Sequence, residues 1–212
     1  MKKGVKAVIF DVGGVLALGG GNSQKIKWHY TKGVHSFLAD YFKINIDQWF
    51  DSIDTVYAKS IEGKISEKET LSIMAKNLKV PLKKLKRIFI KTYKRNFKQN
   101  KPLYKFAFSL KKKGYKIAIL SDQWHISRRA LIKKKYMKRF DKVIISCDVG
   151  MRKPSIKIYK FILQKLSLPP HSTVFIDNRE WNLKPAKKLG MKTILFKNNR
   201  QLIQELSKLG VK

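Results

Sequence analysis

The stretch Lys6-Ala-Val-Ile-Phe-Asp-Val-Gly-Gly-Val-Leu16 decides the fold. Its first five residues form a short apolar run, typical of a strand that is buried on both faces of a parallel sheet. Asp11 follows this run directly, and Gly13 and Gly14 come just after it. The sequence therefore predicts a carboxylate at the carboxyl end of the first strand. At Gly13 and Gly14 the backbone carries no side chains, so it can approach a ligand closely.

Four further apolar runs of the same kind follow along the chain, at residues 116–120, 143–145, 173–176 and 193–196. Segments with helical spacing follow or separate them, at residues 103–113, 126–135, 154–166, 183–189 and 202–209. Strands that alternate with helices in this way indicate an α/β fold. We expect a doubly wound, Rossmann-like parallel sheet.

The segment between the first and second strands is far longer than one crossover helix requires. Its helical patterns cover residues 25–42, 46–60, 66–78 and 82–97, and none of it suggests a strand. We interpret residues 18–102 as an inserted α-helical cap that folds over the carboxyl edge of the sheet. Residues 1–17 and 103–212 then make up the α/β core.

Polar residues follow the predicted strands at their carboxyl ends, where open α/β sheets bind their ligands. These residues are Asp11, Ser121 with Asp122, Lys153, and Asp177 with Asn178. Each is a weak indication alone, because an aspartate or a serine after a strand is often only a helix cap. Together they offer carboxylates, a hydroxyl, an ammonium group and an amide, the set that phosphoryl transfer uses.

Four segments resemble the motifs of the haloacid dehalogenase (HAD) superfamily. The resemblance covers the whole predicted core and is closest to sugar-phosphate phosphatases and the phosphatase domain of soluble epoxide hydrolases. That family places a helical cap directly after its first motif. The matching segments are Phe10-Asp-Val-Gly-Gly-Val-Leu16, Ile119-Leu-Ser-Asp122, Asp148-Val-Gly-Met-Arg-Lys-Pro154, and Val174-Phe-Ile-Asp-Asn178 with Asn182-Leu-Lys-Pro-Ala186.

The resemblance implies a Mg²⁺-dependent phosphatase in which Asp11 attacks phosphorus and forms an aspartyl-phosphate. Ser121 and Lys153 would be its other catalytic residues. The implied phosphate-binding groups are Gly13, Gly14, Ser121, Asp122 and Lys153, and the implied Mg²⁺ ligands are Asp11, Gly13, Asp177 and Asn178. Which of Asp177 and Asn178 binds the metal stays open at this stage.

Two positions depart from the family pattern. Gly13 stands where the wider superfamily has an aspartate that acts as general acid and base, a group that contributes about a hundredfold or more. Asn178 stands where relatives have a second metal-binding aspartate. An amide oxygen lacks the charge of a carboxylate, so Mg²⁺ affinity should fall. These departures keep open a protein that binds a phosphorylated ligand without turnover. Dehalogenation, which also uses an aspartate nucleophile, is a further alternative.

Aromatic residues and histidines are the candidates for substrate contact. Trp124 and His125 follow the second motif and are predicted to reach the substrate. Within the insertion, the candidates are Trp28, His29, Tyr30, His35 and the turn at residues 62–64. Aromatics at helical spacing are more often core residues than ligand contacts.

The composition is strongly basic, with a net charge of +34 and no acidic residue from Thr70 to Ser121. Such a field attracts anions, so a phosphorylated metabolite or nonspecific nucleic acid is an expected partner. Residues 82–98 predict an amphipathic helix with a cationic face. A single cysteine, Cys147, suits the cytoplasm. No apolar run approaches the roughly 20 residues of a membrane span, and the sequence does not indicate an oligomeric state.

Overall fold

Five parallel strands form the central sheet of the computed structural model, which describes residues 4–19 and 33–211. The strand order is β5-β4-β1-β6-β7, so β1, which precedes Asp11, is the middle strand. Asp11 continues the ladder beyond β1, since its backbone N–H donates to the Ile176 carbonyl. The strands are β1 (Ala7–Phe10), β4 (Lys116–Ser121), β5 (Lys142–Ile145), β6 (Thr173–Asp177) and β7 (Lys192–Leu195).

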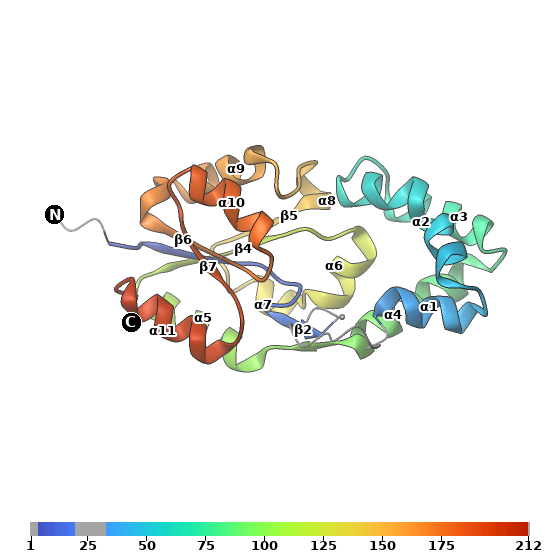
Figure 1. Cartoon of the computed structure of the whole chain (residues 1–212), viewed down its shortest axis with the longest axis horizontal. Helices are drawn as coiled ribbons and strands as arrows, with labels where there is room; N and C mark the ends of the chain where they lie inside the picture. Colours follow the sequence, from blue (N-terminus) through green and yellow to red (C-terminus); the bar gives the residue numbers. More distant parts are fainter. Residues whose placement is uncertain (1–3, 20–32, 212) are drawn as a thin grey trace.

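Helices cover both faces of this sheet (Figure 1). Successive residues of β1 point to opposite faces, so Val8 and Phe10 join one buried apolar cluster while Ala7 and Ile9 join another. The first cluster includes α5 (Lys101–Lys112) and α11 (Asn199–Lys208), and the second includes α9 (Ile156–Leu166) and α10 (Glu180–Lys188). This arrangement confirms the predicted doubly wound α/β sheet.

Four helices lie between the first and second strands of the central sheet and gather at one end of it (Figure 1). The chain enters them through β2 (Ala17–Gly19) and leaves through β3 (Phe97–Gln99), and these two strands pair antiparallel. The expectation that residues 18–102 contain no strand was therefore wrong. Three-residue strands that pair across a long insertion leave no local periodicity to read. The helices are α1 (Val34–Phe42), α2 (Ile46–Ile61), α3 (Glu67–Asn77) and α4 (Leu82–Asn96).

Smaller differences concern element boundaries. The helix expected over residues 126–135 is broken into α6 (His125–Leu131) and α7 (Lys134–Met137). The short helix α8 (Ser146–Val149) and the 3-10 turn η1 (Pro170–Ser172) have no counterpart in the prediction. The helix expected from residue 25 is described only as α1, because residues 20–32 lie outside the described part of the chain.

The basic helix α4 packs as its pattern predicts. Leu85, Phe89 and Tyr93 are buried on its inner face, whereas Lys84 and Lys91 are exposed on the outer one. The apolar stripe therefore holds α4 in place and leaves its cations in solvent. Contact of this face with nucleic acid stays a prediction. In the described ranges, no helix combines the length and apolar character that crossing a bilayer demands.

Candidate active site

Asp11, Lys153 and Asp177 form a buried charged cluster at the carboxyl edge of the sheet. The Lys153 Nζ lies 3.0 Å from Asp11 Oδ1 and 2.6 Å from Asp177 Oδ2. All three side chains are nearly or fully buried, with Asp177 at 0% exposure. One ammonium thus serves two carboxylates that approach it from adjacent strands β1 and β6.

Burial makes the charged form of Asp11 costly. It raises the pKa of Asp11 to about 6, although Lys153 opposes this rise and a hydrogen bond from the Ser121 hydroxyl opposes it further. Lys153 behaves differently. Burial lowers its pKa, but the nearby Asp11, Asp177 and Asp122 carboxylates outweigh burial and hold the pKa of Lys153 above its usual range. The lysine is therefore a permanent cation beside a carboxylate of unusually high proton affinity.

Both oxygens of Asp177 accept hydrogen bonds inside the protein. Its Oδ1 accepts from the Arg179 backbone N–H at 2.8 Å. Its Oδ2 accepts from Lys153 at 2.6 Å and from the Asn182 amide at 3.0 Å. Since these donors surround a carboxylate without solvent exposure, Asp177 acts structurally as the anchor that directs the Lys153 ammonium toward Asp11.

Asn178 has the opposite character. Its side-chain Oδ1 is buried and has no hydrogen-bond partner among the described residues. A buried polar atom without a partner normally costs free energy, and such atoms often mark the position of a missing ion or water. Asn178 thus has a side-chain oxygen without a partner, whereas both Asp177 oxygens already accept hydrogen bonds.

Ser121 and its neighbours support Asp11 from strand β4. The Ser121 hydroxyl accepts a hydrogen bond from the Gln123 amide at 3.1 Å while it bonds to Asp11. Asp122 Oδ1 accepts from the Lys153 backbone N–H at 3.0 Å. Burial raises the pKa of Asp122, and Lys153 opposes the rise. These bonds fix the position of both the candidate nucleophile and the lysine.

One predicted phosphate-binding group already has a partner within the protein. The Gly14 backbone N–H donates to the Ala17 carbonyl at 2.8 Å, within the tight turn that follows β1. A local turn therefore already uses this N–H, and phosphate binding at Gly14 stays a prediction. Gly13 instead lines the cavity above Asp11.

The donor set suits a hard divalent cation held by few carboxylates. No group of three or more His, Cys, Asp or Glu side chains that could hold a metal occurs among the described residues. The available oxygens are the Asp11 carboxylate, the unpartnered Asn178 amide and the backbone around Gly13. Mg²⁺ commonly binds through one or two carboxylates and fills its other positions with water and substrate phosphate. The residues present fit that ion.

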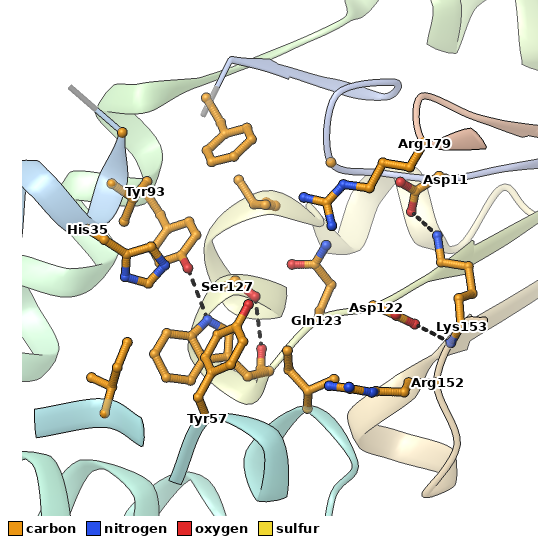
Figure 2. A pocket seen from close by; sticks show the side chains of 18 of the residues that line it. Asp11, His35, Tyr57, Tyr93, Asp122, Gln123, Ser127, Arg152, Lys153 and Arg179 are labelled. Carbon is orange, nitrogen blue, oxygen red and sulfur yellow. Dashed lines mark hydrogen bonds and ion pairs between the residues drawn. The ribbon is translucent and has the colours of Figure 1, made fainter. Parts of the chain in front are cut away.

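A cavity of about 760 Å³ opens above the cluster, between the sheet edge and the helices of the insertion (Figure 2). Asp11, Gly13, Asp122 and Lys153 lie at its core side. One face of α2 forms much of the other side. The cavity-lining residues of α2 are Phe50, Ile53, Asp54, Tyr57 and Ile61, which repeat with helical spacing.

The predicted substrate contacts have different outcomes. Trp124 lines the cavity, although it is only 2% exposed and its indole donates to the Tyr93 hydroxyl at 3.0 Å. His125 is not among the lining residues, because its Nε2 lies 3.1 Å from the Ile65 carbonyl of the insertion. The contact that the structure shows for His125 is therefore with the insertion, and a substrate contact at His125 stays a prediction. The histidine joins the insertion to the core.

His35 lines the cavity, and its Nδ1 accepts from the Trp49 indole at 3.0 Å. Burial lowers the pKa of His35 to about 4, so the ring is neutral near pH 7. The turn at residues 62–64 instead packs on the core: Glu62 lies 3.6 Å from Arg152, and a Cβ on Gly63 would lie 2.3 Å from the Cys147 carbonyl oxygen. Trp28, His29 and Tyr30 lie outside the described residues.

Several lining residues were not predicted from the sequence. They are Gln123, Tyr57, Arg152, Arg179 and Trp181. Three of them are direct neighbours of motif residues, since Gln123 follows Asp122, Arg152 precedes Lys153 and Arg179 follows Asn178. Adjacency to the motifs was thus the usable signal for these three. Tyr57 and Trp181 gave none, because their orientation depends on how helices α2 and α10 pack.

Known proteins resemble this chain in sequence and in structure. The chain is 31% identical over 224 residues to the bifunctional epoxide hydrolase 2 of Sus scrofa, covering 97% of this chain and 39% of that protein. It is 34% identical over 92 residues to a glyceraldehyde 3-phosphate phosphatase of Methanocaldococcus jannaschii, covering 42% of this chain and 40% of that protein. Each match thus covers about two fifths of the relative's own length.

A HAD family enzyme of Bacteroides thetaiotaomicron has a similar fold, with a TM-score of 0.72, 19% identity and coverage of 91% of this chain and 94% of that one. That structure is an aspartate-to-alanine mutant in complex with magnesium and inorganic phosphate. The family model of haloacid dehalogenase-like hydrolases matches residues 5–190, which include Asp11, Ser121, Lys153, Asp177 and Asn178. The chain belongs to the haloacid dehalogenase-like hydrolases.

Proposed function

We propose that the chain is a Mg²⁺-dependent hydrolase of small phosphomonoesters, sugar phosphates among them, that works through an aspartyl-phosphate on Asp11. One observation carries the proposal. The Asp11 carboxylate lies 3.0 Å from the Lys153 ammonium at the core side of a cavity large enough for a metabolite. The phosphatase relative and the magnesium–phosphate complex of a similar fold support it.

In the first step, an Asp11 oxygen forms a bond to phosphorus while the bond from phosphorus to the alcohol oxygen breaks, and the leaving alkoxide takes a proton from water because Gly13 supplies no general acid. Lys153 offsets the negative charge that gathers between Asp11 and the phosphoryl oxygens. Asp177 keeps the ammonium in place through its 2.6 Å contact. Water then attacks phosphorus, which releases inorganic phosphate and restores the Asp11 carboxylate.

Asp11, the Gly13 carbonyl and Asn178 Oδ1 would hold the Mg²⁺. The bound ion would act as a Lewis acid on a phosphoryl oxygen. Asp177 contributes to the site through Lys153 rather than as a ligand, because its two oxygens already accept three hydrogen bonds. Asn178 brings no charge, so this site should bind Mg²⁺ more weakly than one with two carboxylates.

The test is phosphate release from a panel of phosphomonoesters, with Mg²⁺ or with EDTA, by the wild-type protein, Asp11→Asn and Asp51→Asn. Asp51 is exposed on α2 and does not line the cavity, so its variant is the matched control. We expect Mg²⁺-dependent release that Asp11→Asn abolishes and Asp51→Asn retains.

Equal release by Asp11→Asn, or none from any substrate, would contradict the proposal. Binding of phosphate without release would favour the alternative of a phosphate-binding protein. Halide release from a 2-haloacid in place of phosphate release would identify a dehalogenase instead.

A further inference from the structure

The cavity above Asp11 exposes large aromatic side chains to solvent. Phe50 is 47% exposed, Tyr57 is 38% exposed and Trp181 is 56% exposed, and all three line this cavity. Burying a large aromatic side chain is strongly favourable, so a group of exposed ones around a cavity indicates a ligand that covers them.

Helices α1, α2, α4 and α6 form one side of the cavity, which we call the inner wall, and this wall holds Tyr57 in a fixed orientation. Its ring meets the buried ring of Trp124 edge to face, with centroids 5.0 Å apart and planes at 72°. Phe50 and Tyr57 lie two helical turns apart on α2, and the His35 ring contacts both, at centroid distances of 5.7 and 6.3 Å. A ligand would therefore meet a preformed aromatic surface rather than mobile side chains.

The opposite side of the cavity, formed by the segment after β6 and the start of α10, presents a second flat surface. The Arg179 guanidinium lies 5.3 Å from the centroid of the Trp181 ring, a cation–π contact. Arg179 extends into the cavity on the side of Asp11 (Figure 2). Tyr57, Arg152 and Arg179 all line this cavity. Two planar surfaces from different walls thus border the same space.

Polar groups deep in the inner wall are already paired. The Tyr93 hydroxyl accepts from Trp124, the His35 Nδ1 accepts from Trp49, and the Ser127 hydroxyl donates to the Trp124 carbonyl at 3.1 Å. A sugar needs partners for its hydroxyls, because an unpaired buried hydroxyl is costly. Tyr93, His35 and Trp124 offer ring faces instead.

We infer that the preferred substrate is a phosphomonoester whose alcohol carries a planar aromatic or heteroaromatic ring. The phosphate lies on Asp11, and the ring packs against Tyr57 and the Trp181 face. The inference deepens the proposed function and rests on it for turnover, but it also makes a claim about binding alone.

The experiment is a calorimetric titration with three non-hydrolysable phosphonates in saturating Mg²⁺. The ligands are 3-phenylpropylphosphonate, 3-cyclohexylpropylphosphonate and 3-hydroxypropylphosphonate, which share the phosphonate and the linker. We expect the phenyl compound to bind about threefold to tenfold more tightly than the cyclohexyl one, because only a planar ring stacks on the aromatic faces. The hydroxyl compound should bind most weakly.

Tyr57→Leu and Trp181→Leu keep an apolar side chain and remove the ring faces, so each should lower the ratio of phenyl to cyclohexyl affinity toward one. Tyr41→Leu is the matched control, because Tyr41 is 41% exposed on α1 and does not line the cavity. Its ratio should stay at the wild-type value. Equal binding of the two ring compounds by the wild-type protein, or a ratio unchanged in both variants, would overturn the inference.

Phosphate release from 2-phenylethyl phosphate separates this inference from the proposed function. Preferential binding of the phenyl compound without any release would contradict the proposed function and leave the inference standing. Release from 2-phenylethyl and 2-cyclohexylethyl phosphates with equal kcat/KM would support the proposed function and contradict the inference. The comparison is fair because both compounds have a primary alkoxide as leaving group.

Discussion

Gly14 and Asn178 occupy adjoining space, and only a glycine permits the present position of the amide. A Cβ on Gly14 would lie 2.3 Å from Asn178 Nδ2 and 2.7 Å from its Cγ. Gly14 also has a φ of +83°, which side chains rarely adopt. We therefore expect Gly14→Ala to displace Asn178 and to weaken Mg²⁺ binding about tenfold or more. Calorimetric titration with Mg²⁺ measures this loss.

Gly114→Ala separates displacement from backbone strain. Gly114 has a similar φ of +89°, but a Cβ added there would have no atom of the described residues within 4 Å. Both variants should lose about 1–2 kcal/mol of folding stability to the left-handed backbone, and Gly14→Ala should lose more because of its clash with Asn178. Only Gly14→Ala should also lose Mg²⁺ affinity. If Gly14→Ala bound Mg²⁺ with wild-type affinity, the position of Asn178 that Gly14 permits would not matter for metal binding, and the prediction would be wrong.

Asn178→Asp should strengthen Mg²⁺ binding, by about tenfold, because a carboxylate adds charge to a side-chain oxygen that has no partner within the protein. Without metal, the same change places another carboxylate close to Asp11 and Asp177 and should lower the melting temperature. Asn198→Asp is the control, since the side-chain oxygen of Asn198 already accepts from the Gln201 backbone N–H at the start of α11. Calorimetry and thermal unfolding with EDTA test both effects. An unchanged affinity would mean that Asn178 does not bind the ion.

Gly13→Asp should add the missing general acid. The nearest atom to a Cβ on Gly13 is Gln123 Nε2 at 4.0 Å, so the site has room for the side chain. A general acid protonates the leaving alcohol, and its contribution of about a hundredfold is largest for poor leaving groups. We expect kcat for alkyl phosphates to rise more than kcat for p-nitrophenyl phosphate. A plot of log kcat against leaving-group pKa checks this, and an unchanged slope would count against the prediction.

Asp11→Asn should stabilise the metal-free protein at neutral pH. The folded-state pKa of Asp11 is about 6 against an ordinary 3.8, so the folded protein disfavours the ionised form. This penalty is full above pH 6 and disappears as pH falls below about 4, because Asp11 is then protonated in both states. The variant should gain on the order of 1–3 kcal/mol at pH 7.5 and little at pH 4. Urea unfolding with EDTA at both pH values measures the gain. A difference in unfolding free energy between variant and wild type that is the same at both pH values would refute the prediction.

The sequence was sufficient for the sheet because its strands are continuous apolar runs. Each run from β1 to β7 of the central sheet appears close to its predicted place, and Asp11, Ser121 and Asp177 lie at the strand ends. Short elements were beyond reach. The β2–β3 pair and α8 consist of three or four residues, and their existence depends on contacts with distant parts of the chain.

The polar centre was predictable from motif order, whereas the cavity walls were not. Asp11 and Lys153 are 3.0 Å apart, as their places after the strands suggest. The different roles of Asp177 and Asn178 could not be read from two adjacent letters, because they depend on which oxygen meets a donor. Likewise, His125 turns to Ile65 and Trp181 faces the cavity through tertiary packing alone.

The pairing of β2 with β3 has an evolutionary consequence. Gly19 and Phe97 are partners in this ribbon, so the chain departs from the sheet and returns to it at one place. Segments whose ends lie side by side can be lengthened, shortened or exchanged without rerouting the rest of the fold. The charged cluster of Asp11, Lys153 and Asp177 lies wholly outside the excursion that this ribbon closes. Its chemistry can therefore be inherited intact while the cavity-lining residues of the insertion, such as Phe50 and Tyr57, are replaced.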